Sequence, residues 1–195
     1  MMRRINQILR RLPVWAVWLA GLIPLALLVW DTVQGNLGVD PVVRIEHRLG
    51  RTALYYLIGA LAVTPLLRLG RLNLIRFRRA LGLLGFTYIC LHLAAWVVLD
   101  MGLLWTQMLK DVVKRPYLTF GMVALALLIP LAVTSNNLSI RRMGARSWQN
   151  LHRLAYPATA LAGLHYLWVG KVAKPQPLFW LGIIVILLIL RLGRR

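Results

Sequence analysis

The side chains in this chain best suited to binding a redox cofactor are its four histidines, His47, His92, His152 and His165. His92 and His165 lie inside long apolar stretches. An ionisable side chain in a membrane-crossing stretch is energetically costly and usually functional. Neutral imidazole is a common axial ligand of haem iron. We therefore expect His92 and His165 to be metal ligands.

These two histidines lie at matching depths along their apolar stretches. His92 lies 12 residues beyond Ala80, which is about 18 Å of α-helix. His165 lies 13 residues beyond His152, about 20 Å by the same rise. Both stretches are expected to run outwards from the cytoplasm, so both imidazoles would lie toward the outer leaflet. Two neutral imidazoles facing each other at one depth are typical of a bis-histidine haem site.

Small and aromatic residues accompany both histidines at helical spacing. Gly85 lies seven residues before His92, Tyr88 lies one turn before it, and Ala158 lies two turns before His165. Small residues would leave space for a porphyrin, with aromatic side chains along its edge. They would equally allow helices to pack closely. The residue types alone leave both interpretations open.

His152 marks a second place where haem could bind, at the cytoplasmic end of the same stretch as His165. The matching positions near His92 hold Arg78 and Arg79, so a second haem would have one identifiable histidine ligand. The two arginines could instead pair with haem propionates, because fixed cations suit carboxylates. On an ideal helix His152 and His165 do not share a face, although a kink at Pro157 could change this.

Six apolar segments would position these histidines. Hydrophobic residues make up 59% of the chain, and the mean hydropathy is +0.68, which is high for a soluble domain. A transmembrane helix needs about 20 apolar residues, with a lower limit near 17. We therefore expect an all-α integral membrane protein, a single bundle of six transmembrane helices. The expected spans are residues 12–30, 52–69, 80–99, 117–134, 154–169 and 177–192.

The charged residues predict how this bundle is oriented. Lys and Arg total 24 against five Asp and Glu, a formal net charge of +19. Sixteen of the basic residues lie at the termini and after the second and fourth spans, whereas the other eight and all five acids lie in the remaining loops. The positive-inside rule then places both termini in the cytoplasm. Because the charges alternate with apolar runs, anionic lipid is a better partner than nucleic acid.

Four further features are expected to be structural. The arginines before the first span indicate an uncleaved signal-anchor. Cys90, the only cysteine, lies in an apolar run and is expected to be a buried, inert thiol. His47 is expected at the outer membrane interface. Residues 103–113 space Leu104 and Met108 at helical intervals, which favours a short interfacial helix, either a tether or a docking surface for an outer partner.

Other function classes lack the residues that they need. The sequence has no glycine-rich dinucleotide motif and no Walker motif. No acidic residue lies in the middle of an expected span, which counts against an ordinary proton-coupled transporter. Every acid lies on the expected outer side, so no serine, histidine and aspartate triad can be assembled.

Several stretches of the chain, taken in order, resemble one protein family. They are residues 40–68, LHLAAW around His92, RPYLTFG at 115–121, SWQNLHRLAY around His152 and HYLW at His165. Together they resemble the MsrQ family, formerly YedZ, of haem-binding membrane subunits. That family is part of the ferric reductase-like transmembrane group. The resemblance runs from about Leu12 to Arg191, nearly the whole chain.

The resemblance implies a function, cofactors and ligands. Members of the family lie in the bacterial inner membrane, bind haem b and are reported to bind FMN. They pass electrons from the quinone pool, or from a cytosolic flavin reductase, to MsrP, a periplasmic molybdopterin subunit that reduces methionine sulfoxide in oxidised envelope proteins. The family's ligand histidines correspond to His92, His152 and His165. The wider group has a fourth ligand histidine and a flavin- and NADPH-binding domain, which this sequence lacks.

We therefore expect an electron-transfer subunit rather than a catalytic one, working as a heterodimer with MsrP. Electrons would pass from an inner donor by a haem near His152 to the haem held by His92 and His165, and then to the outer partner. The inner arginines could attract an acidic cytosolic donor as well as lipid. Two alternatives stay open: a stand-alone ferric or superoxide-type oxidoreductase, and a transporter or scaffold whose histidines bind a metal or nothing.

Overall fold

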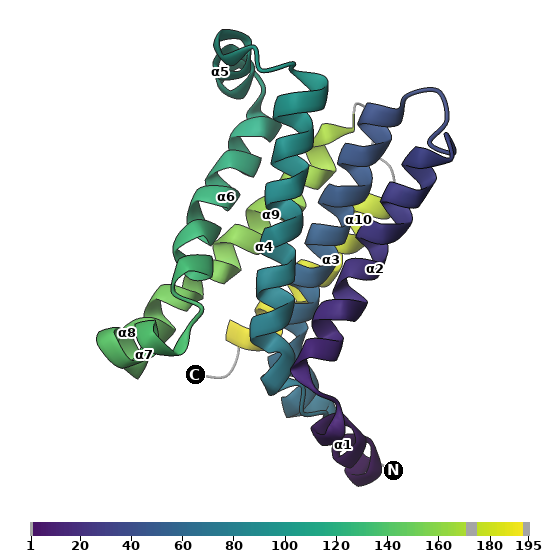
Figure 1. The fold of residues 1–195 in the computed structure, drawn as a ribbon. Helices are drawn as coiled ribbons and strands as arrows, with labels where there is room; N and C mark the ends of the chain where they lie inside the picture. The colour runs from purple at the N-terminus through teal and green to yellow at the C-terminus, as the bar shows by residue number, and fades with distance from the viewer. Residues whose placement is uncertain (1, 171–174, 193–195) are drawn as a thin grey trace. The chain divides into compact units, whose positions relative to one another are not determined.

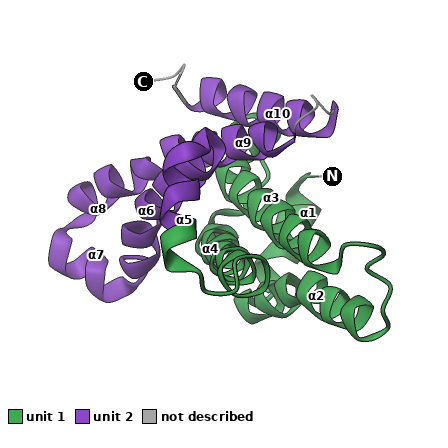
Figure 2. Cartoon of the chain, turned by 90° about the horizontal axis from the view of Figure 1, so that it is seen from above, with its two compact units in different colours: residues 1–108 green, residues 109–195 purple. Residues whose placement is uncertain are grey.

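Every regular element in the part of the chain that the structure describes, residues 2–170 and 175–192, is a helix (Figure 1). The structure is a computed structural model of the full sequence. Its helices form two compact units, residues 1–108 and 109–195 (Figure 2), which we describe one at a time. The expected all-α fold class is confirmed.

The first unit is built on three long apolar helices, α2 (Val14–Val33), α3 (Pro41–Gly70) and α4 (Arg78–Ala95). α4 packs along α3, and α2 packs against both of them (Figure 1). A π-helical turn, η2 (Trp96–Asp100), prolongs α4. The shorter elements are α1 (Met2–Arg11), η1 (Ile75–Phe77) and α5 (Trp105–Lys114), and α5 crosses the boundary between the units.

Local signals at both ends of α3 explain its length. The Asp40 side chain accepts a hydrogen bond from the backbone N–H three residues on, and Pro41 occupies the first helical position, where no N–H is needed. The helix ends where Arg71 adopts a left-handed conformation with a φ of 53°. Because α3 begins this early, Glu46 and His47 lie within the helix, ahead of the expected second span.

A buried hydroxyl ties α4 to α2. Tyr88 Oη donates to the Gly21 oxygen at 2.8 Å and accepts from the Leu25 N–H at 3.0 Å. In a regular helix that N–H would bond to Gly21 directly, so the phenol is inserted into the ladder of α2 beside Pro24. Tyr56 of α3 donates a second bond to Gly21 at 3.1 Å. The two hydroxyls thereby provide partners for backbone groups that the apolar surroundings cannot.

The second unit contains three apolar helices, α6 (Pro116–Val133), α9 (Ala155–Val169) and α10 (Pro175–Leu192). α9 packs against both α6 and α10. Between α6 and α9 the chain forms α7 (Asn137–Met143), α8 (Ala145–Leu151) and a 3-10 turn, η3 (His152–Leu154). Gly144, with a φ of 79°, makes the break between α7 and α8, a conformation that glycine adopts without strain.

Four helical stretches are long and apolar enough to cross a membrane by length and composition: Val14–Val33, Pro41–Gly70, Ile75–Asp100 and Pro116–Val133. They coincide with the first four expected spans. The fifth and sixth expected spans coincide with α9 and α10, which do not meet the same criterion. The chain is therefore a membrane protein with several apolar helices, whereas the total of six spans and the cytoplasmic termini stay predictions.

One expectation drawn from an apolar run is corrected, and the short helix expected at residues 103–113 is found. Cys90 is exposed on α4 rather than buried. It lies two positions from the buried Tyr88, which is about 200° around the helix, so it faces away from the core. A helix does form there as α5, with Met108 buried and Leu104, Leu109 and Val113 exposed. Its place at the membrane interface stays a prediction.

Replacing Tyr88 by phenylalanine should lower the free energy of unfolding by about 1–3 kcal/mol, because buried polar groups of α2 lose a partner. Tyr56→Phe should have a smaller effect, because the Gly21 oxygen keeps its bond from Tyr88. Thermal unfolding of both purified variants in detergent, followed by circular dichroism, measures the difference. An equal or larger loss in Tyr56→Phe would contradict the role given to Tyr88.

Candidate functional site

His92 lies in the last turns of α4, against the first turns of α3. Its Nδ1 is 3.0 Å from the backbone oxygen of Glu46. A carbonyl oxygen can only accept, so Nδ1 carries the proton, and in the neutral ring the lone pair lies on Nε2. A methyl group added at Gly50 would lie 3.3 Å from Cε1 of His92, so the ring lies directly against this glycine. We call His92, the Glu46 carbonyl and Gly50 the first half-site.

His165, in α9 of the second unit, is held against α6 in the same way. Its Nδ1 is 2.7 Å from the backbone oxygen of Tyr117, which again assigns the proton to Nδ1 and the lone pair to Nε2. A methyl group added at Gly121 would lie 3.0 Å from Nδ1 of His165. The side-chain rings of Tyr117 and His165 are tilted, with centroids 6.2 Å apart. His165, the Tyr117 carbonyl and Gly121 form the second half-site.

Each half-site presents an imidazole in the form that haem iron binds. A hydrogen bond from Nδ1 to a carbonyl fixes the tautomer and the ring orientation and raises the basicity of Nε2. Haem brings most of the iron's ligands itself, so the protein would need to contribute only one or two imidazoles. Within residues 2–170 and 175–192 no group of three or more His, Cys, Asp or Glu side chains could hold a bare metal ion. The residues of both half-sites therefore fit haem.

His152, in η3 of the second unit, is held differently. Its Nε2 is 3.1 Å from Oγ1 of Thr134, and its ring stacks on Trp148 with centroids 3.8 Å apart. Oγ1 of Thr134 donates to the Pro130 oxygen, so its lone pairs are directed at the imidazole. The indole N–H of Trp148 donates to the Thr134 carbonyl. Nε2 of His152 would have to leave Thr134 before it could bind iron.

Arg78 and Arg79, the arginines predicted to pair with haem propionates, lie apart from the first half-site. Arg78 and Arg79 are exposed in the first turn of α4, about 20 Å along that helix from His92. His47 is exposed on α3, as expected for an interfacial histidine. The two arginines and His152 belong to different units. Their pairing with the propionates of one haem therefore stays a prediction.

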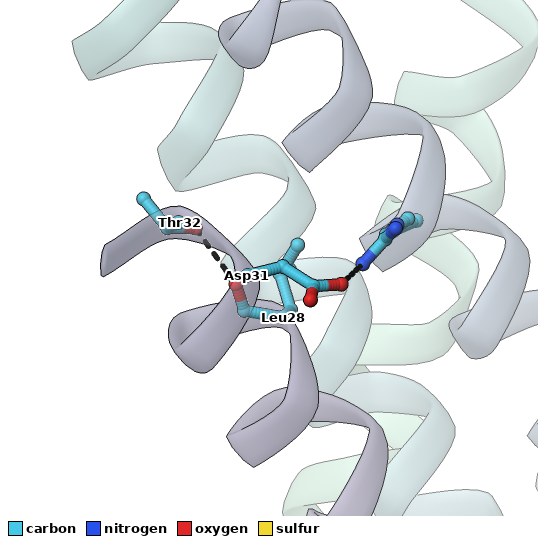
Figure 3. Close-up of polar contacts among 4 residues, drawn as sticks. Leu28, Asp31 and Thr32 are labelled. Carbon is cyan, nitrogen blue, oxygen red and sulfur yellow. Dashed lines mark hydrogen bonds and ion pairs between the residues drawn. The ribbon is translucent and has the colours of Figure 1, made fainter. Parts of the chain in front are cut away.

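An ion pair fixes the C-terminal end of α2 beside the first half-site. The carboxylate of Asp31, labelled in Figure 3, pairs with Arg48. Arg48 lies in α3 two residues after Glu46. One turn of α2 is also closed by Thr32, whose hydroxyl donates to the Leu28 oxygen at 2.7 Å (Figure 3). The ion pair therefore holds α2 against the turn of α3 that supplies the acceptor carbonyl. In the same turn, one carboxylate oxygen of Glu46 is buried and has no hydrogen-bond partner in the described part of the chain.

Sequence reasoning identified the histidines but missed the glycines that accommodate them. A methyl group at Gly85 would lie 3.0 Å from a side-chain carbon of Leu57, so this glycine serves helix packing, one of the two interpretations left open. The glycines that meet the imidazoles are Gly50 and Gly121. Each follows its acceptor residue by four positions, in EHRLG and YLTFG. That shared spacing was the signal available in the sequence.

Comparisons with known proteins agree on one family. Residues 49–163 match the family described as ferric reductase like transmembrane component. Proteins from Brucella ovis, Brucella canis and Brucella abortus, each named protein-methionine-sulfoxide reductase heme-binding subunit MsrQ, are 45% identical to this chain over 183 residues. The aligned part covers 92% of this chain and 83% of each of these relatives. The similarity thus extends over nearly all of the chain, including both half-sites.

The geometry predicts the protonation of both histidines in the haem-free protein. Histidine-labelled protein in detergent, studied by nitrogen NMR with single His→Gln variants for assignment, should show Nδ1 of both His92 and His165 protonated. Their carbonyl partners enforce this tautomer. A ring protonated at Nε2 alone, in either residue, would contradict the described hydrogen bond.

Proposed function

The chain belongs to the MsrQ family of the ferric reductase-like transmembrane group, and on that premise we propose that it binds haem b through His92 and His165 and carries electrons across the membrane. The observation that best supports this proposal is the matched tautomer of the two histidines. In each half-site a backbone carbonyl takes the Nδ1 proton, so Nε2 carries the lone pair that an iron needs. The names of the relatives, which are heme-binding subunits, support the same cofactor.

The residues of the half-sites would hold the cofactor, which supplies an iron that takes up and releases one electron at a time. His92 and His165 would be the residues that bind the haem iron. The carbonyls of Glu46 and Tyr117 hold the Nδ1 protons and orient both rings, which leaves Nε2 of each ring as the atom that would bind the iron.

The partners follow from the family. The relatives are named as subunits of a protein-methionine-sulfoxide reductase, which supports an outer acceptor that reduces methionine sulfoxide, the molybdopterin subunit MsrP. The donor would be the quinone pool or a cytosolic flavin reductase, with FMN as a second cofactor. A bacterial inner membrane with both termini in the cytoplasm would place the arginine-rich loops on the donor side. The arginines there would attract an acidic donor protein.

A second haem, near His152, is a separate part of the proposal. Arg78 and Arg79 would then lie near the propionates, as fixed cations at the cytoplasmic headgroups. In the structure Nε2 of His152 is hydrogen-bonded to Thr134. His92 and His165 differ in this respect, because the hydrogen bond described for each of them is made by Nδ1. Binding of this haem would therefore require His152 to turn away from Thr134, and the first haem does not depend on it.

The family match favours one alternative function. Residues 49–163 match a ferric reductase like component, so the chain could deliver electrons to ferric iron or to oxygen without a protein partner. The two functions share the haem and differ in the acceptor. Purified reduced protein should be oxidised rapidly by MsrP and slowly by a ferric chelate. The opposite order would favour the stand-alone oxidoreductase.

His92→Ala and His165→Ala should each abolish the same haem bands, because each would remove a histidine that holds the haem. His152→Ala should leave those bands in place, and His47→Ala, at an exposed residue, is the matched control. Reduced-minus-oxidised visible spectra of protein expressed with ample haem measure all four variants. If the wild-type protein lacked haem bands, or if His92→Ala and His165→Ala kept them, the proposed function would be wrong.

Orientation in the membrane can be tested with single cysteines. In a Cys90→Ser background, Gln7→Cys in α1 should be protected from a membrane-impermeant maleimide in intact spheroplasts, whereas Gln107→Cys in α5 should be labelled. Both glutamines are exposed on the protein, so burial does not account for the difference. Labelling of Gln7→Cys from outside would reverse the proposed orientation.

A further inference from the structure

The two half-sites share one construction, although they lie in different units and in unlike sequences. In each unit an earlier helix supplies a carbonyl and, four residues later, a glycine; the next long helix packed against it supplies the histidine (Figure 1). The helix pairs are α3 with α4 and α6 with α9. Histidine and acceptor are separated by 46 residues in the first pair and by 48 in the second. The chain thus contains two versions of one histidine-presenting hairpin.

The position of the glycine has a physical reason. In an α-helix the carbonyl of residue i points toward the C-terminus and bonds to the N–H of residue i+4. Every Cα–Cβ bond tilts toward the N-terminus, so the side chain of residue i+4 covers the turn in which that carbonyl lies. A side chain at this position would shield the second lone pair of the oxygen. A glycine leaves the lone pair accessible to a donor from a neighbouring helix.

The distances show that the imidazoles occupy the space a side chain would take. A methyl group at Gly50 would lie 3.3 Å from Cε1 and 3.4 Å from Nδ1 of His92. A methyl group at Gly121 would lie 3.0 Å from Nδ1 and 3.2 Å from Cε1 of His165. An added methyl group therefore presses on the ring next to the nitrogen that makes the hydrogen bond, and it presses harder at Gly121.

Three other tightly packed glycines that lie within helices serve a different purpose. Methyl groups at Gly21, Gly85 and Gly163 would meet aliphatic side chains, those of Leu84, Leu57 and Ile184. Such contacts are typical of closely packed membrane helices. At Gly50 and Gly121 the nearest atoms all belong to histidine rings. Close packing alone does not account for two glycines that each face a histidine and lie four residues after its acceptor.

We propose that Gly50 and Gly121 are positioning residues for the haem ligands: each keeps a backbone carbonyl accessible to the Nδ1–H of one histidine and thereby fixes the ring plane and the donor strength of its Nε2. This inference rests on the proposed function, since it concerns the same two ligands. The two glycines touch the ligands and not the iron. Replacing either glycine should therefore alter the EPR signal and the midpoint potential of the haem, while the haem itself stays bound.

The test compares Gly50→Ala and Gly121→Ala with Gly82→Ala and Gly182→Ala, in holoprotein purified from membranes. Gly82 in α4 and Gly182 in α10 are helical, and a methyl group at either would meet no heavy atom within 4 Å. Alanine at Gly50 or Gly121 should leave haem bound but shift the low-spin EPR signal and the midpoint potential, more strongly at Gly121. Both control variants should keep the wild-type signal and potential.

The inference is wrong if Gly50→Ala and Gly121→Ala keep the wild-type EPR signal and potential, or if the controls shift them equally. At Gly50 the ring needs to move by only a few tenths of an ångström. That variant is expected to fold, and it decides the question even where Gly121→Ala does not accumulate. Haem that survives His92→Ala and His165→Ala would overturn the proposed function itself. Haem lost in those variants but unperturbed in the glycine variants would overturn only the positioning role.

Discussion

A histidine within a membrane helix must give its N–H to an acceptor, because lipid offers none, and in this chain the acceptor is the carbonyl of a neighbouring helix. That oxygen already accepts the helical N–H four residues on, so the imidazole uses its second lone pair. Access to this lone pair requires a short distance between helices, an antiparallel register that brings the two turns together, and no side chain in between. His92 and His165 both meet these requirements.

The rest of the first unit can be understood as fixing that register. The cap at Asp40 sets where α3 begins and hence where the Glu46 carbonyl lies. The ion pair between Asp31 and Arg48 holds the end of α2 to the adjacent turn of α3. One turn before His92 on α4, Tyr88 is bonded into α2 at Gly21. The ion pair and the Tyr88 hydrogen bond each join two helices near the histidine, so a slip of one residue along α3 or α4 would break one or both of them.

The bounds of the apolar helices could be predicted from the sequence to within a few residues, except that α3 begins well before its expected span. His92 and His165 could be singled out because an ionisable side chain is energetically costly inside a membrane. It could not identify Gly50 and Gly121, because their role depends on which turn of one helix faces which turn of the next. The position of Cys90 in an apolar run also led to a wrong prediction, since an apolar run does not say which face of the helix is buried. Gly85 illustrates the same limit: its spacing from His92 suited a porphyrin, and its contact is with Leu57.

Use of the backbone as acceptor also explains why the two half-sites look unrelated in sequence. A carboxylate acceptor would strengthen the ligand further but would add a charge in the membrane, whereas a carbonyl adds none. Because the carbonyl is the same in every residue, the acceptor position can be Glu46 in one hairpin and Tyr117 in the other. Only the glycine four residues later is constrained by the contact itself. Two hairpins can therefore hold a histidine in the same way while sharing only that histidine and one glycine. A search for sequence repeats does not detect so small a similarity.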